Sequence, residues 1–129
     1  MLSQLQILMP FPSKYEIGCY FHEDKISEIY YGSKNFIQFG EVDDYNGSFH
    51  SHPKRSSLYE SCFKFSLYDI RLSIRNEESI IALGYLNHLG YFDLRKGRVK
   101  KMIKSYLSNP SEYQLGKIRD HINEYLIEC

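Results

Sequence analysis

The stretch His50-Ser51-His52-Pro53 marks the end of a predicted strand and places two metal-binding side chains there. In an extended segment, residues i and i+2 point to the same face, so both imidazoles are offered together. The proline after His52 removes a backbone donor and ends the strand, so the two rings lie where the strand ends and a loop begins. Two imidazoles supply two of the about three protein ligands that a catalytic zinc ion needs.

Length and composition favour one globular domain in a reducing compartment. A chain of 129 residues can bury one core but is too short for the ~250-residue barrel enzymes that also use a His-x-His pair. Sixteen Lys plus Arg balance sixteen Asp plus Glu, so no net charge favours nucleic acid or an anionic membrane. Three sparse cysteines argue against a disulfide framework. No apolar run reaches the ~20 residues of a membrane helix. We therefore expect a cytoplasmic protein without a nucleic-acid or membrane partner.

The residue pattern predicts an α+β domain in which a β-sheet precedes two helices. Apolar and aromatic runs predict strands at 15–21, 26–31, 36–42, 49–52, 79–86 and 91–94. Turns are expected at 22–25, 43–47 and 87–90, and a polar loop at 54–64. Helical spacing predicts one helix from Val99 to Leu107, ended by Asn109-Pro110, and another from Ser111 to Leu126. We assign 1–129 to one domain, with a leader (1–12), a sheet with the metal site (13–95) and C-terminal helices (98–128).

The segment from Ser66 to Arg75 fits two structures. Ser66 is a good N-cap and Asp69 falls at the third helical position, which favours a helix. Ile70, Leu72 and Ile74 alternate as in a strand, so periodicity alone leaves both structures open.

Two carboxylates complete a candidate metal site. Two histidines and one carboxylate, with water in the fourth position, form a common catalytic zinc arrangement, and Asp69 is the candidate third ligand. A second carboxylate would take and return the proton of the metal-activated water, and Glu16 on the first predicted strand is the candidate.

Three short motifs together resemble the signature of the JAMM (MPN-domain) zinc metalloproteases. These are Glu16-Ile17-Gly18, His50-Ser51-His52-Pro53 and Ser66-Leu67-Tyr68-Asp69, in the family's order, and the resemblance covers about positions 10–95. One departure is that thirteen residues (53–65) separate His52 from Ser66, where the family usually leaves about seven. A longer surface loop costs little closure entropy. Glu60 and Cys62 in this loop are alternative ligands, and Asp69 is retained.

The resemblance implies a curved mixed β-sheet flanked by helices, in the cytidine-deaminase-like architecture of JAMM domains. It implies Zn²⁺ held by His50, His52 and Asp69, with Glu16 as general acid/base and Ser66 stabilising the tetrahedral oxyanion. Family members commonly cleave peptide or isopeptide bonds to ubiquitin or ubiquitin-like tails, whereas others are non-catalytic scaffolds.

We therefore expect a zinc metalloprotease or isopeptidase that acts on an extended protein tail. The alternative is a non-catalytic JAMM-fold scaffold or protein-binding module. A metal-bound nucleic-acid processing protein is a weaker option, because the net charge is zero. The remaining histidines, His22, His88 and His121, are assigned no metal. The apolar stripe 115–126 is interpreted as core, with a homodimer or assembly-partner surface on the C-terminal helices as the alternative.

Overall fold

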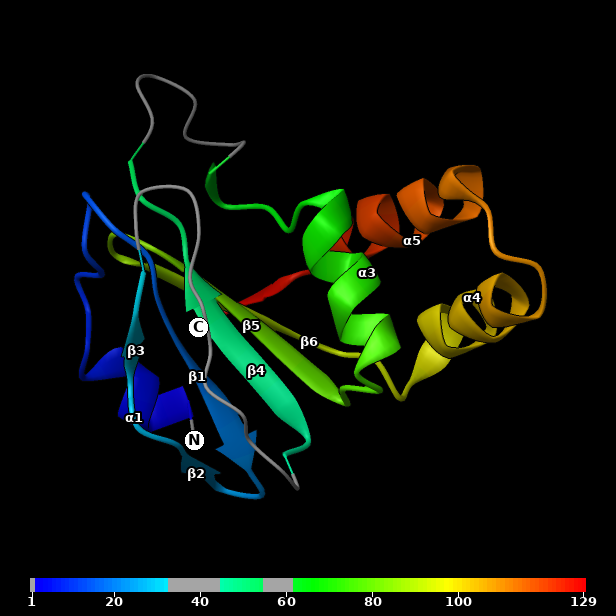
Figure 1. Cartoon of the computed structure of the whole chain (residues 1–129). Coiled ribbons are helices and arrows are strands. Elements are labelled where there is room, and N and C mark those ends of the chain that lie inside the picture. Colours follow the sequence, from blue (N-terminus) through cyan, green and yellow to red (C-terminus); the bar gives the residue numbers. More distant parts are fainter. Residues whose placement is uncertain (1, 33–44, 55–61) are drawn as a thin grey trace.

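A mixed β-sheet forms the centre of the protein in the computed structural model, which describes residues 2–32, 45–54 and 62–129 (Figure 1). The strand order is β2-β1-β4-β5-β6-β7, and β3 also pairs with β1. The strands are β1 (Ile17–His22), β2 (Lys25–Ile26), β3 (Tyr30–Tyr31), β4 (Gly47–Ser51), β5 (Ile80–Tyr85), β6 (His88–Asp93) and β7 (Ile127–Glu128). The helices are α1 (Leu2–Gln6), α3 (Leu67–Arg75), α4 (Gly97–Ser108) and α5 (Glu112–Glu124). The predicted α+β class is confirmed.

Strand β4 lies between two different kinds of neighbour. It runs antiparallel to β1, where Gly18 pairs with His50, and parallel to β5, where His50 pairs with Leu83. Parallel strands need a crossover connection, and α3 lies within the one that joins β4 to β5. The end of β4 therefore meets the beginning of β1 at one end of the sheet.

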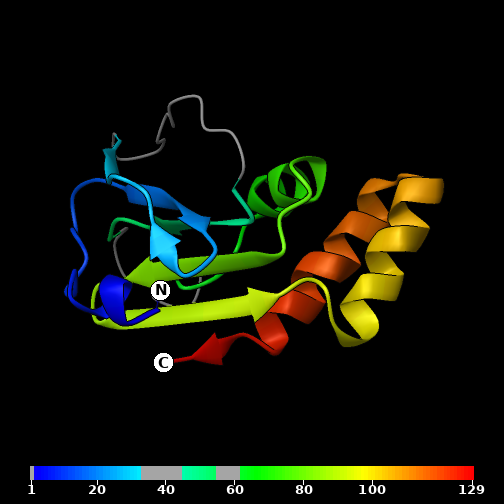
Figure 2. The ribbon, with the colours of Figure 1, turned by 90° about the horizontal axis from the view of Figure 1, so that it is seen from below.

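Each face of the sheet is covered by its own apolar cluster. Alternation along β5 sends Ile81 and Leu83 to the cluster shared with α3, α4 and α5, and Ala82 to the opposite cluster. That opposite cluster includes Leu5 and Phe11, so the predicted leader contributes fully buried side chains to the core. In Figure 2, α4 and α5 lie side by side, far from α1.

Two predicted strands differ most from the structure. The expected strand 26–31 is split into β2 and β3. The Ser27 N–H donates to the Tyr20 carbonyl (2.8 Å), but the Tyr20 N–H donates to Ser27 Oγ (2.9 Å) rather than to a main-chain carbonyl, so the ladder is interrupted there. Strand β6 begins at His88 instead of residue 91, since Tyr85 pairs with His88 and leaves a turn of only Leu86 and Asn87. The expected strand 36–42, like residues 43 and 44 of the expected turn, lies outside the described residues. Gly47 of that turn belongs to β4.

The helical predictions agree with the structure, and the ambiguous segment is helical. Ser66 caps α3, and Ser111 Oγ accepts a hydrogen bond from the Gln114 N–H at the start of α5 (3.1 Å). In the predicted stripe 115–126, Leu115, Ile118 and Ile122 are buried in the core, whereas Tyr125 follows the last residue of α5 and is exposed. In residues 2–32, 45–54 and 62–129, no helix combines the length and the apolar character needed to span a membrane.

Candidate metal centre

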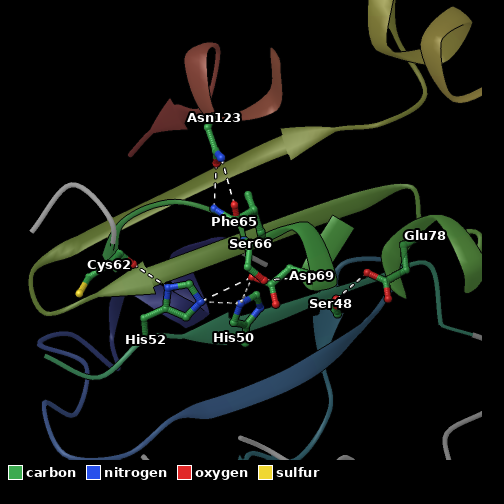
Figure 3. Close-up of polar contacts among 9 residues, drawn as sticks. All are labelled: Ser48, His50, His52, Cys62, Phe65, Ser66, Asp69, Glu78 and Asn123. Carbon is green, nitrogen blue, oxygen red and sulfur yellow. Dashed lines mark hydrogen bonds and ion pairs between the residues drawn. The ribbon is translucent and has the colours of Figure 1, made fainter. Parts of the chain in front are cut away.

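Strand β4 delivers the two histidines to one face of the sheet. Gly47, Phe49 and Ser51 are buried, whereas Ser48 and His50 are half-buried on the other side of the strand. The extended course continues past the strand, because the His52 N–H donates to the carbonyl of Gly84 (2.9 Å). His50 and His52 therefore share a face, and their Nε2 atoms lie 3.0 Å apart (Figure 3).

The first turn of α3 delivers Asp69 to the same point. Ser66 and Asp69 form a capping box in which Ser66 Oγ accepts from the Asp69 N–H (3.1 Å) and Asp69 Oδ2 accepts from the Ser66 N–H (2.9 Å). The same Oδ2 atom lies 3.2 Å from His50 Nε2 and 3.6 Å from His52 Nε2. The cap therefore orients the carboxylate toward the two rings.

His50, His52 and Asp69 form a group that can hold a metal ion. Each offers one ligand atom, and these atoms lie within 4.8 Å of one another. All three residues are half-buried, so the ligand atoms are partly shielded from water while the group stays accessible. The structure thus brings together the three residues that the sequence analysis selected as ligands.

The electrostatic field around the rings is negative. Burial disfavours the charged imidazole of His50, but the charge of Asp69 and a hydrogen bond to it outweigh burial and raise the pKa of His50. Glu16 and Glu78 act in the same direction. Burial also opposes ionisation of Asp69, yet the charge of His50 and several hydrogen bonds hold the Asp69 pKa well below its usual value. The nearby carboxylates therefore favour positive charge at His50, whether a proton on the ring or a bound cation.

A main-chain carbonyl sets the tautomer of His52. His52 Nδ1 lies 2.7 Å from the carbonyl oxygen of Cys62, which can only accept, so Nδ1 carries the proton. In the neutral ring, Nε2 then keeps its lone pair on the side of His50 and Asp69. Metal-binding histidines typically donate their second N–H in this way. The Cys62 sulfur points away from both rings in Figure 3, so the thiol proposed as an alternative ligand does not join the group. Glu60 lies outside the described residues.

Glu16 lies directly before β1 and is only 8% exposed. Gly18, two residues further along, pairs with His50, so alternation puts Glu16 and His50 on one face of the sheet. Its contribution to the His50 pKa agrees with this placement. Ser51 holds the start of β1 against the end of β4, because its fully buried Oγ accepts from the Ile17 N–H (3.0 Å).

Three supporting groups were not predicted from the sequence. They are the Ser51 hydroxyl, the Cys62 carbonyl and the side chain of Asn123, which binds the main chain next to the site. Ser51 stands inside the His-x-His motif, so its position was visible, but nothing in the pattern indicated a hydrogen bond to β1. The other two depend on contacts across the fold.

No family model, curated protein or solved structure matches the chain.

Proposed function

We propose that the protein is a zinc-dependent hydrolase of the JAMM type, a protease or isopeptidase that acts on an extended protein tail. The observation that carries the proposal is the convergence of His50 Nε2, His52 Nε2 and Asp69 Oδ2, which lie 3.0–3.6 Å apart. Glu16 is buried and lies on the face of the sheet that carries His50, which supports the second part of the proposal, a group that transfers the proton of the attacking water.

The spacing of the ligand atoms suits zinc. Tetrahedral zinc with bonds of about 2.0–2.1 Å has its ligand atoms about 3.3 Å from one another. The three observed separations are 3.0, 3.2 and 3.6 Å, which bracket that value. Two imidazoles and one carboxylate favour zinc over Mg²⁺ or Ca²⁺, because these harder ions prefer oxygen ligands. Three protein ligands also leave a fourth position open, as in catalytic rather than structural sites.

Each neighbouring residue has a chemical role in this proposal. Zinc bound there would act as a Lewis acid on the scissile carbonyl and would lower the pKa of water. The Glu16 carboxylate would accept a proton from the attacking water and return it to the leaving amine. Ser66 stands at the N-terminus of α3 and is exposed, so its hydroxyl can donate to the oxyanion that forms at the carbonyl.

An open groove next to Ser66 offers room for a peptide. It has a volume of about 630 Å³ and lies between residues 64–67 and the α5 side chains Arg119, Asp120, Asn123 and Glu124. Both signs of charge line it, which suits the mixed polar groups of a protein tail more than a polyanion. We propose that part of the substrate lies in this groove, with the bond to be cleaved near Ser66.

The proposal is tested by metal content and by cleavage of a ubiquitin-like fusion, with and without a chelator. Glu16→Gln should keep zinc at one equivalent and lose about 10²–10⁴-fold in kcat. Glu23→Gln, at an exposed turn, is the matched control and should behave as wild type. Turnover by Glu16→Gln at the wild-type rate would reject the assigned base. Bound zinc without cleavage of any conjugate would favour the scaffold alternative.

A further inference from the structure

Asn123 on α5 holds the main chain of a residue that lies 58 positions earlier in the chain. The Phe65 N–H donates to Asn123 Oδ1 (2.8 Å), and Asn123 Nδ2 donates to the Phe65 carbonyl (3.0 Å). Both bonds are visible in Figure 3. The amide thus pairs with Phe65 as a neighbouring strand would, although residues 62–66 lie outside every strand of the sheet.

The segment 62–66 contacts all three candidate metal ligands. The Cys62 carbonyl accepts from His52 Nδ1 (2.7 Å). The Phe65 ring, which is 2% exposed, packs edge-on against His50 with ring centroids 5.9 Å apart. Ser66 exchanges two hydrogen bonds with Asp69. A shift of this one segment would therefore disturb every ligand at once.

We infer that Asn123 is a positioning residue of the metal centre. By pairing with both main-chain groups of Phe65, it fixes the segment 62–66 and, through that segment, the orientation of the ligands. The inference rests on the proposed metal-binding function and adds to it a residue from the C-terminal helix. Groups that orient metal ligands from outside typically change metal affinity about 10–100-fold when they are lost.

The chemistry of the contact requires an amide. The main chain of Phe65 presents one donor (N–H) and one acceptor (C=O), and the Asn123 amide offers the complementary acceptor (Oδ1) and donor (Nδ2). A carboxylate at this position still accepts from the N–H but faces the Phe65 carbonyl with a second negative oxygen. Asn123→Asp therefore keeps size and shape and breaks one of the two bonds, whereas Asn123→Ala removes both.

The test is the zinc dissociation constant of the full chain, measured by competition with a chromophoric chelator. Asn123→Asp and Asn123→Ala should raise Kd about 10–100-fold. Ser111→Ala removes the N-cap of the same helix without touching Phe65 and should change Kd by less than about twofold. Asn87→Asp, at an exposed turn, is the chemical control for the Asn-to-Asp exchange. Far-UV circular dichroism of each variant checks that it is folded.

The outcomes separate the two proposals. Wild-type affinity in both Asn123 variants, with zinc bound by the wild type, would overturn the positioning role and leave the metal centre intact. Equal weakening by Ser111→Ala would also overturn it, because the effect would then come from a loosened helix. If the wild type itself does not bind zinc, the metal centre and this inference both fail.

Discussion

Zinc should raise the melting temperature of chelator-stripped protein by an amount that follows from its binding. The three ligand atoms meet within 4.8 Å only in the folded chain, so zinc binds the native state in preference to the unfolded one. At about 100 times Kd, the added stability is about 2.7 kcal/mol. For a domain of 129 residues, 1 kcal/mol moves Tm by roughly 3–5 °C, which gives an expected rise of about 8–14 °C.

Variants of the ligand residues test whether this rise in Tm comes from zinc at the candidate site. Structural zinc sites bind with about 10–16 kcal/mol over four ligands, so one ligand contributes roughly 3 kcal/mol, or about 100-fold in Kd. At the same zinc concentration, His52→Ala should then gain only about 2 °C. Asp69→Asn should lose a similar part of the zinc-induced rise in Tm. Its amide oxygen can still accept from the Ser66 N–H, so the helix cap persists.

The measurement is differential scanning calorimetry with and without zinc. His88→Ala is the control, since His88 pairs with Glu128 (3.1 Å) and stands outside the ligand group. It should keep the full rise. A wild-type rise below about 2 °C at saturating zinc would refute the stabilisation argument. An equal rise in His52→Ala would show that the zinc binds elsewhere.

Three further predictions concern stability without metal and are measured by urea unfolding in a chelator. Ser66→Ala removes the cap of α3 and should cost about 1 kcal/mol. Burial raises the pKa of Glu78 above its unfolded value, so its ionised form is disfavoured in the fold. The stability of wild type relative to Glu78→Gln should be greatest at acidic pH and fall as pH rises through that raised pKa. Gly47→Ala puts a Cβ 2.2 Å from the Ile80 carbonyl and should cost about 3 kcal/mol or more, whereas Gly116→Ala should be neutral or stabilising by up to ~1 kcal/mol.

Ser66→Thr keeps a capping hydroxyl and should recover most of the stability, so an equal loss in both variants would reject the capping explanation. A constant difference between wild type and Glu78→Gln from pH 4 to 8 would mean that the carboxyl is not perturbed. Equal stabilities of Gly47→Ala and Gly116→Ala would contradict the close approach of β4 to β5.

The ligands were predictable because each motif contains its own local geometry. His50 and His52 share a face in any extended segment, and Ser66 with Asp69 forms a cap in any helix that starts there. Neither motif predicts the distance between the two histidines and Asp69. That separation is set by the crossover that joins β4 to β5, which is a property of the fold.

The errors in the predicted strands and turns arose where one residue behaved unlike its type. Ser27 uses its side chain to bind Tyr20, which breaks a run that otherwise reads as one strand. Leu86 occupies a turn position with φ of 49°, a conformation that apolar residues rarely adopt. In α3, Ile70 and Ile74 face the core and Leu72 is half-buried, so a strand-like alternation also fitted a helix.

The supports of the site were beyond prediction for a different reason. A main-chain carbonyl such as that of Cys62 is present at every residue, so no residue type indicates that it will meet His52. Asn123 is one half-buried asparagine in a helix whose apolar stripe explains the rest of its pattern. Its partner is the main chain of Phe65, and only the docking of α5 beside α3 brings the two together.

The metal centre and the core are built from different residues, and this determines what zinc can do for folding. The apolar clusters on both faces of the sheet are complete without a ligand atom from His50, His52 or Asp69. Two of the three ligands are also oriented by hydrogen bonds to protein groups, since the Ser66 N–H donates to Asp69 and the Cys62 carbonyl accepts from His52. Small zinc domains that lack such a core unfold when the metal is removed. Here the chelator-stripped protein should still melt cooperatively, and zinc should shift that transition rather than create it, because binding meets ligands that the fold has already placed.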